Sequence, residues 1–203
     1  MIRTGFLFIL SYLVGAVPTG YLLTKIMHKK DIREYGSGNI GFANVLRTVG
    51  VVTGIMVLIV DTGKSFLATY YFSRIFEEAT LYRLLFGIAV ILGNIFNPFL
   101  KFKGGKGVSA GLGVALAFNP FSVIFSLLAF LFTVKITKYI SLGSLIAATV
   151  YLISNIFFYI YTDYDIYSAV FAIIIFCAII LRHISNIKRL IQGEENKIGT
   201  KKQ

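Results

Sequence analysis

The chain has 203 residues, of which 57% are hydrophobic and only 14% are charged, and its mean hydropathy is +0.79. This composition excludes an ordinary soluble domain and indicates an integral membrane protein. The formal net charge of +11 must then be concentrated in loops, where it would attract anionic lipid head groups or phosphorylated substrates. No soluble basic domain remains to bind nucleic acid. The single cysteine, Cys177, excludes an internal disulfide and a cysteine metal site.

Seven apolar segments follow one another along the chain, at approximately 5–27, 49–73, 81–100, 107–118, 120–134, 139–161 and 165–182. The longer segments have about 20 residues, which is the length that a helix needs to cross a bilayer. Asn119-Pro120 separates the fourth segment from the fifth, because proline lacks a backbone donor and disfavours helix in the residue before it. We therefore predict an all-α polytopic membrane protein with seven transmembrane helices, some of them short, in a single membrane-embedded domain over residues 1–203.

The distribution of basic residues predicts the orientation of these helices. With seven helices, 16 of the 20 Lys and Arg residues fall in the loops and tail of one face. Fusing the fourth and fifth segments would move Lys135, Lys138 and the basic tail to the opposite face. The positive-inside rule therefore places the N-terminus in the periplasm and the C-terminus in the cytoplasm. Seven tyrosines near the expected outer boundary agree with an aromatic belt: Tyr70, Tyr71, Tyr82, Tyr159, Tyr161, Tyr164 and Tyr167.

The first polar cluster follows the first apolar segment and reads Gly36-Ser37-Gly38-Asn39-Ile40-Gly41, with Asn44 and Arg47 shortly after it. Its glycines have the G-x-G-x-x-G spacing of a dinucleotide-binding loop. That fingerprint requires a preceding β-strand in a soluble βαβ unit, whereas the segment before this cluster has the length of a membrane helix. A dinucleotide-dependent enzyme is therefore not expected.

Asp61 and Lys64 lie inside the second apolar segment, three residues apart and so on one face of a helix. Each charge would cost about 2.5–3.5 kcal/mol at the middle of a bilayer. Two interpretations remain open. The pair is an internal ion pair that orients the helix, or it lines the functional site from beneath.

The second polar cluster, Lys101 to Gly107, reads KFKGGKG. Glycines can turn backbone N–H groups inward to form an anion-binding nest, and neighbouring lysines neutralise the bound charge. The alternative is a flexible basic turn whose lysines reach lipid phosphates. A second glycine-rich polar loop on the same face favours anion binding.

The third cluster, His183 to Lys197, follows the last apolar segment and is predicted to contain a short amphipathic helix at the membrane interface. His183, Asn186 and Arg189 share its polar arc with Gly193. A histidine at a membrane surface, beside an amide and a guanidinium, is a candidate acid–base group or substrate ligand. The alternative is a structural histidine.

These clusters together resemble the motifs of the bacterial acyl-phosphate:glycerol-3-phosphate acyltransferase family of inner-membrane enzymes, and the likeness covers nearly the whole chain. The family's first motif, S-G-N-x-G-A-T-N-x-x-R, is matched at Ser37, Gly38, Asn39, Gly41, Asn44 and Arg47. The second, F-K-G-G-K-G-V-A-T, is matched by residues 102–108. The third, H-x-x-N-I-x-R-L-x-x-G-x-E, is matched at His183, Asn186, Ile187, Arg189, Leu190, Gly193 and Glu195. The family's D-x-x-K pair corresponds to Asp61 and Lys64.

The chain departs from the family pattern at a few positions. Phe42 and Ala43 replace the Ala-Thr of the first motif, and Ser109-Ala110 replaces the end of the second. The family commonly has G-H-x-F-P before the second motif, where this chain has Asn94 in place of the histidine. A histidine role at that position therefore does not carry over.

The resemblance implies that the sn-1 hydroxyl of glycerol 3-phosphate attacks a long-chain acyl phosphate, giving lysophosphatidic acid and phosphate for phospholipid synthesis, without a cofactor or metal. An acyl phosphate is already activated, so anion stabilisation is needed more than a strong general acid. The implied catalytic residues are His183, Asn186 and Ser37. The implied substrate-binding residues are Gly38, Asn39, Gly41, Asn44, Arg47, Lys103, Gly104, Gly105, Lys106, Gly107, Arg189 and Glu195, with Asp61 and Lys64 in support. Either His183 or a substrate phosphate would accept the proton.

The expected partners are glycerol 3-phosphate, long-chain acyl phosphate, membrane lipids and, as a candidate, the soluble enzyme that makes acyl phosphate. The expected location is the bacterial inner membrane, with the active site facing the cytoplasm. The rival function is a transporter of phosphorylated solutes, which would need polar residues near the bilayer midplane. Polar clusters at one surface favour the enzyme. A lipid-binding scaffold would leave Ser37, Asn39, His183 and Asn186 without a role.

Overall fold

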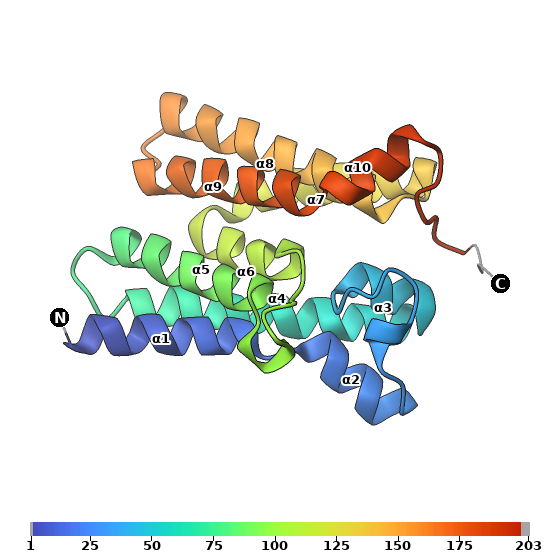
Figure 1. The fold of residues 1–203 in the computed structure, drawn as a ribbon. Coiled ribbons are helices and arrows are strands. Elements are labelled where there is room, and N and C mark those ends of the chain that lie inside the picture. The colour runs from blue at the N-terminus through green and yellow to red at the C-terminus, as the bar shows by residue number, and fades with distance from the viewer. Residues whose placement is uncertain (1, 200–203) are drawn as a thin grey trace. The chain divides into compact units, whose positions relative to one another are not determined.

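The structure, a computed structural model, describes residues 2–199. Every regular element in that range is a helix and none is a strand, which confirms the all-α prediction (Figure 1). The chain divides into two compact units, of which unit 1 ends at Phe118 and unit 2 begins at Asn119. This division coincides with the predicted break at Asn119-Pro120. That the two units act as one domain stays a prediction.

Unit 1 contains the first four expected apolar segments and the loops that carry the first two motifs. In chain order its elements are α1 (Ile2–Ala16), α2 (Thr19–His28), the short η1 (Ile32–Glu34), α3 (Phe42–Thr48), α4 (Val51–Ser73), α5 (Ala79–Ile95), the short η2 (Pro98–Leu100) and α6 (Val108–Phe118). The first expected segment is thus two helices, because Pro18 lies between α1 and α2 and cannot donate a backbone hydrogen bond.

Close backbone contacts hold α1 against α5. A Cβ atom on Gly93 would strike the carbonyl oxygen of Tyr12, and one on Gly15 would strike the backbone of Val90. Membrane helices gain little hydrophobic energy from association, since lipid tails are as apolar as their side chains, and they rely instead on close packing at small residues. Glycine at these two positions therefore permits the α1–α5 contact.

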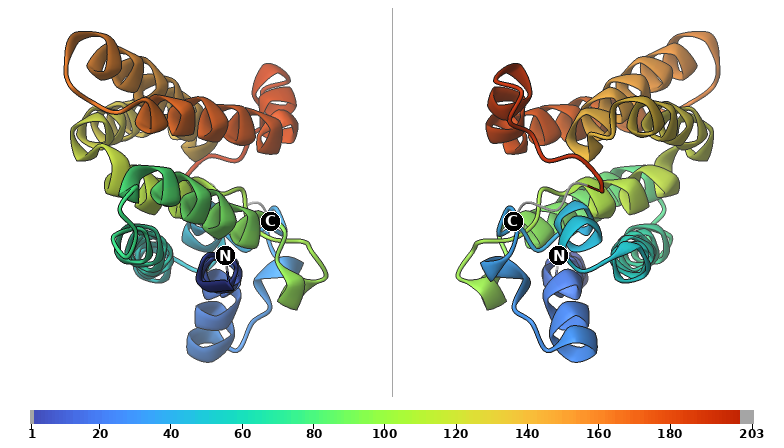
Figure 2. Two further views of the ribbon diagram at one scale, coloured as in Figure 1. Left: turned by 90° about the vertical axis from the view of Figure 1, so that its left-hand side faces the viewer. Right: turned by 90° about the vertical axis from the view of Figure 1, so that its right-hand side faces the viewer.

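Unit 2 consists of α7 (Pro120–Thr137), α8 (Ile140–Tyr161), α9 (Ile166–Arg182) and α10 (Ile184–Ile191), seen from two further sides in Figure 2. The Asn119 side chain accepts the Ser122 N–H at 3.1 Å and caps α7, and the Asp165 side chain caps α9 through Ser168. The Ser168 hydroxyl also donates to Asn155 Oδ1 on α8 at 2.7 Å. These polar contacts join α8 to α9 at one end of the unit.

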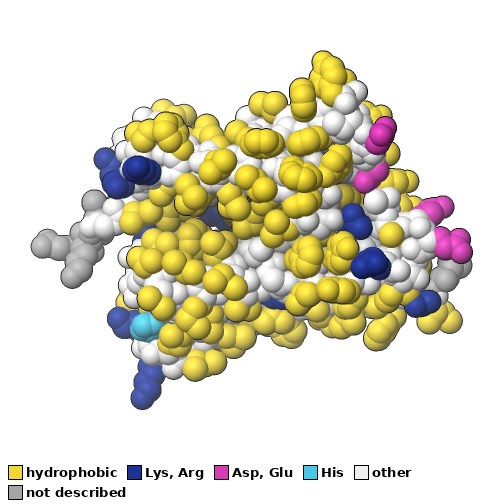
Figure 3. All heavy atoms as spheres, turned by 180° about the vertical axis from the view of Figure 1, so that it is seen from behind, with side chains coloured by type: hydrophobic (Ala, Val, Ile, Leu, Met, Phe, Trp, Pro, Cys, Tyr) yellow, Lys and Arg dark blue, Asp and Glu magenta, His cyan; other side chains and the backbone are white. Residues whose placement is uncertain are grey.

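Apolar side chains cover most of the face shown in Figure 3. On α7 alone, large apolar side chains remain exposed at Phe121, Ile124, Phe125, Leu128, Leu131 and Phe132. Such a continuous apolar surface would be unfavourable in water and suits contact with lipid tails.

Helices occupy all seven apolar segments that the sequence predicted. Within residues 2–199, five spans are long and apolar enough to cross a membrane, with α1 and α2 counted together. A sixth is obtained if α9 and α10, bent by 58°, are taken as one span, while α6 is a shorter apolar helix. A membrane-spanning role for all seven, and their orientation, stay predictions.

Candidate active site

The first motif forms a loop between η1 and α3, and the buried Asn44 organises it. Asn44 Oδ1 accepts the Ser37 N–H at 2.9 Å, and its Nδ2 donates to the carbonyl oxygens of Tyr35 at 3.0 Å and Asn39 at 2.9 Å. The amide is thus engaged by the loop backbone on both sides. Asn44 sets the shape of the motif, and its predicted contact with substrate stays a prediction.

The same loop presents Ser37 at its surface. Ser37 and Gly38 are exposed, and Gly38 has a φ of +69°, which glycine adopts without a steric penalty. Asn39 Oδ1 accepts the Gly41 N–H at 2.9 Å, just before α3 begins. Arg47, in the last turn of α3, is partly exposed. The first motif thus has an exposed hydroxyl and a partly exposed guanidinium.

The second motif is a hydrogen-bonded loop attached to the end of α5. The Gly104 N–H donates to the Ile95 carbonyl at 3.1 Å, and the Gly105 N–H donates to the Asn94 carbonyl at 2.9 Å. A Cβ atom on Gly104 would collide with both carbonyl oxygens, so the close approach requires glycine. These two N–H groups hold the loop against α5 instead of pointing into an anion nest, and the predicted contact of the loop with substrate stays a prediction. Of the lysines next to these glycines, Lys103 is exposed and Lys106 is partly exposed.

Two residues that precede these glycines have positive φ angles, which are uncommon for residues other than glycine. Lys101 and Phe102 have φ values of +53° and +60°. This left-handed conformation costs about 1–2 kcal/mol for each residue other than glycine. Backbone hydrogen bonds maintain it, since the Phe102 N–H donates to the Asn97 carbonyl at 2.7 Å and the Lys103 N–H donates to the Leu100 carbonyl at 3.0 Å.

Asn97 connects this loop to the end of α1. Its Nδ2 donates to the Ala16 carbonyl at 2.5 Å, and its Oδ1 accepts the Phe99 N–H at 3.0 Å. Asn97 is almost fully buried. The sequence interpretation gave it no role, although Asn followed by Pro98 is a turn signal that could have identified it.

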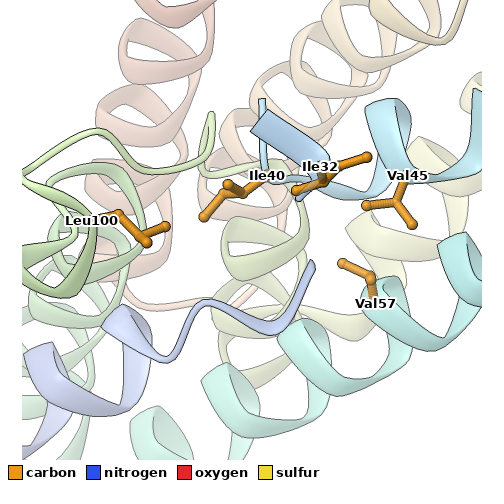
Figure 4. Packing of buried hydrophobic residues seen from close by; sticks show 5 residues of the cluster. All are labelled: Ile32, Ile40, Val45, Val57 and Leu100. Atoms are coloured by element: carbon orange, nitrogen blue, oxygen red, sulfur yellow. The ribbon is translucent and has the colours of Figure 1, made fainter. Parts of the chain in front are cut away.

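A hydrophobic cluster brings the first two motifs together within unit 1 (Figure 4). Its buried members are Ile32, Ile40, Val45, Val57 and Leu100. Ile40 lies inside the first motif, and Leu100 directly precedes the KFKGGKG run. The two glycine-rich loops are therefore neighbours, in agreement with their predicted location on one face.

Asp61 and Lys64 lie at the interruption between α1 and α2. Lys64 Nζ is 2.7 Å from Asp61 Oδ1 and donates to the Val17 carbonyl at 2.5 Å. The Thr19 hydroxyl donates to Asp61 Oδ1 at 2.6 Å. The pair thus satisfies polar groups that the break at Pro18 leaves inside the apolar bundle, which supports the first interpretation, an internal ion pair.

The third motif folds around the carboxylate of Glu195. Glu195 Oε1 accepts from Asn186 Nδ2 at 2.8 Å and from the Ser141 hydroxyl at 3.0 Å, and Oε2 accepts from Arg189 Nε at 2.8 Å. Burial alone would raise the pKa of Glu195, but the hydrogen bonds from Asn186, Arg189 and Ser141 outweigh it and lower the pKa below its ordinary value. Asn186, Arg189 and Glu195 therefore hold one another and fix the tail against α8.

His183 lies at the junction of α9 and α10 and is buried. Its Nδ1 is 2.8 Å from the Ile179 carbonyl oxygen. Because a carbonyl oxygen only accepts, Nδ1 carries a proton and donates it to this oxygen. This contact with α9 orients the ring, and the predicted catalytic roles of His183 and Asn186 stay predictions.

The amino-acid sequence matches the family model described as glycerol-3-phosphate acyltransferase over residues 5–193. The glycerol-3-phosphate acyltransferase of Macrococcus caseolyticus is 38% identical over 202 residues, covering 98% of this chain and 100% of that protein. Glycerol-3-phosphate acyltransferase 2 of Lactobacillus johnsonii is 42% identical over 191 residues, covering 94% of this chain and 85% of that protein.

The fold matches two crystal structures of PlsY, an integral membrane glycerol 3-phosphate acyltransferase. The glycerol 3-phosphate form has a TM-score of 0.87 and the lysophosphatidic acid form one of 0.85, each with 34% sequence identity. Both alignments cover 97% of this chain and 96% of the other. The first two motifs, and the third as far as Gly193, lie inside the residues that the family model matches. The chain therefore belongs to the glycerol-3-phosphate acyltransferase family of integral membrane proteins.

Proposed function

We propose that this protein transfers a fatty acyl group from a long-chain acyl phosphate to the sn-1 hydroxyl of glycerol 3-phosphate, giving lysophosphatidic acid and inorganic phosphate. The observation that carries the proposal is the family match over residues 5–193, which includes every predicted site residue except Glu195. Two of the three motifs are adjacent loops in unit 1, as a shared role in one reaction requires.

The reaction needs anion binding more than strong acid catalysis. The hydroxyl oxygen attacks the acyl carbonyl carbon, the bond from that carbon to the phosphate oxygen breaks, and phosphate leaves with the electron pair. Negative charge grows on the carbonyl oxygen and on the departing phosphate, and cationic donors stabilise both. Arg47, Lys103 and Lys106 of unit 1 would supply such donors. Ser37, Gly38 and Asn39 would hold a substrate phosphate at the exposed surface of the first loop.

We assign His183 to positioning the substrate, while a substrate phosphate takes the hydroxyl proton. A phosphate with a second pKa near 6 suits this proton transfer as well as an imidazole with a pKa near 6.5. Support comes from the hydrogen bonds of the third motif, because the Glu195 carboxylate is engaged by Ser141, Asn186 and Arg189. The carboxylate that would normally pair with a catalytic histidine thus has other partners.

We further propose a seven-span arrangement with the N-terminus outside and the C-terminus inside, in the bacterial inner membrane. The three motifs would then all face the cytoplasm, where glycerol 3-phosphate is available, and the two units would act as one domain. The acyl chain would lie among the apolar helices, where each buried CH₂ contributes about 0.8 kcal/mol. A soluble enzyme that makes acyl phosphate is a candidate partner at this face.

A donor assay tests the reaction. Purified protein in lipid vesicles should release phosphate from palmitoyl phosphate only when glycerol 3-phosphate is present, without added metal. Lysophosphatidic acid should appear in an equal amount. Efficient turnover with acyl-CoA and none with acyl phosphate would overturn the donor assignment.

A further inference from the structure

An exposed aromatic loop, Phe99–Lys103, precedes the glycines of the second motif. The Phe99 side chain is 62% exposed and that of Phe102 is 63% exposed, and Lys101 and Lys103 are exposed as well. Leu100, between them, is buried in the hydrophobic cluster of Figure 4. The loop is therefore anchored by one apolar residue while two phenylalanines and two lysines point outward.

The backbone of the aromatic loop determines this outward display. Asn97 holds the N-terminal side of the loop against α1, and the Gly104 N–H holds its C-terminal side against α5. Between these anchors, Lys101 and Phe102 both adopt the left-handed conformation, which glycine would adopt at lower cost. A strained position that keeps a large exposed aromatic side chain points to a use for that side chain.

The direction of the aromatic loop favours lipid as its environment. In Figure 2 the light green segment that contains η2 extends sideways from the helices of unit 1. A segment that leaves a membrane helix bundle sideways meets the bilayer. Aromatic rings lie favourably at the head-group level, and lysines beside them reach anionic phosphates.

We propose that the aromatic loop inserts Phe99 and Phe102 into the interfacial layer of the membrane and binds an anionic phospholipid head group through Lys101. This arrangement would hold Lys106, three residues beyond the loop, at the depth of the head groups. On the proposed function, the phosphate of a membrane-borne acyl phosphate lies at that depth. Insertion itself does not depend on the reaction.

Because the chain has no tryptophan, a single substitution provides a unique fluorophore. Phe102→Trp protein is reconstituted into vesicles of phosphatidylcholine and phosphatidylglycerol, with and without brominated acyl chains. We expect a blue-shifted emission maximum, strong quenching by brominated lipid and weak quenching by aqueous acrylamide. Phe132→Trp, at an exposed apolar position of α7, is the matched lipid-facing control. N-acetyltryptophanamide in the same buffer is the aqueous reference.

The role of charge is tested in the same background. Removing phosphatidylglycerol should increase acrylamide quenching of the Phe102→Trp protein. Adding Lys101→Gln should abolish that dependence, whereas Lys188→Gln, an exposed lysine on α10, should leave it unchanged. Acrylamide quenching of the Phe102→Trp protein equal to that of the aqueous reference, with no effect of brominated lipid, would overturn the proposal and leave the loop available to a soluble protein. Since no step requires turnover, a failure of the donor assay would leave this result interpretable.

Discussion

Asn44 and Glu195 are buried polar residues that each hold several groups of their own motif in place. Asn44 forms hydrogen bonds with the backbone of Tyr35, Ser37 and Asn39. The Glu195 carboxylate accepts hydrogen bonds from three side chains. Removing either would leave buried partners unsatisfied, at a cost of about 1–3 kcal/mol for each group. Loss of activity in such variants would therefore report the geometry of the motif. Charged residues that are at least partly exposed are the better probes of substrate contact.

Arg47 and Lys106 are such probes. Alanine at either position should reduce kcat/KM by well over tenfold, because each substitution removes a charge-assisted contact worth about 1.5–3 kcal/mol. Lys188→Ala removes the same charge from an exposed position of α10 and should have little effect. Steady-state kinetics with glycerol 3-phosphate and palmitoyl phosphate measures all three. Equal losses in the three variants would mean that the basic residues act only as general surface charge.

His183 distinguishes substrate positioning from base catalysis. Glutamine at this position keeps hydrogen-bonding capacity but cannot accept the proton, whereas alanine loses both. If His183 positions substrate, the Gln variant should retain a tenth or more of wild-type kcat and the Ala variant far less. The pH–rate profile of the Gln variant should then keep its acidic limb. Equal losses of a hundredfold or more, with disappearance of a limb near pH 6.5, would identify His183 as the base.

At the scale of elements, a few polar contacts fix α10 and the segment after it to the rest of unit 2. Ser141, at the start of α8, donates to Glu195, and the Ile198 N–H donates to the Lys138 carbonyl at 2.9 Å. Apolar burial contributes less here, since Ile184 and Ile191 are exposed in the protein. Contact of these side chains with the membrane interface would supply the missing burial.

This dependence on Glu195 predicts an acid limit to stability. Because the folded-state pKa is lowered, the stabilisation is fully present above the unfolded-state value near 4.5 and is lost as the pH falls through the folded-state pKa. The thermal unfolding midpoint of the wild-type protein in detergent should therefore decrease as the pH is lowered below 4.5. Glu195→Gln should be less stable by about 2 kcal/mol at neutral pH, and the acid-dependent fall should be smaller. An unchanged acid profile in this variant would contradict the role of the carboxylate.

The Asp61–Lys64 pair belongs to the same scale, because it stabilises the junction of two helices. Lys64→Met alone leaves a buried carboxylate without its cation and should cost about 3–5 kcal/mol. The double variant Asp61→Asn with Lys64→Met removes both charges and should be more stable than the single variant. Thermal unfolding in detergent compares them. A double variant as unstable as the sum of the single ones would indicate independent roles for the two side chains.

At the scale of the whole molecule, the orientation of the helices decides whether the motifs meet cytoplasmic substrates. Unit 2 has acidic residues before α9, at Asp163 and Asp165, and basic residues in its last turn and beyond it, at Arg182 and Lys188. By the positive-inside rule, this charge asymmetry predicts that the start of α9 lies outside and its end inside.

Cysteine labelling tests the orientation directly. Cys177 is exposed and is first replaced by serine. In this background, Asp163→Cys should react with an impermeant maleimide in spheroplasts, and Gln192→Cys should react only after permeabilisation. Both positions are exposed in the protein. Reaction of both from one side would contradict the seven-span topology.

Local properties of the sequence were sufficient to predict the all-helical membrane class, the break at Asn119-Pro120 and the positions of the three motifs. Hydropathy, proline and glycine act over a few residues, so they can be interpreted without a fold. The interruption at Pro18 is also a local signal, although the length of the apolar run concealed it.

Only the tertiary structure decided which polar atoms form hydrogen bonds that hold distant segments of the chain together. Asn97 bonds to Ala16 across 81 residues, Lys64 to Val17 across 47, and Ser141 to Glu195 across 54. No sequence period encodes such contacts, because they depend on how separate helices pack. For the same reason, the motif pattern assigned the Gly104 and Gly105 N–H groups to an anion, whereas packing against α5 gives them to backbone carbonyls.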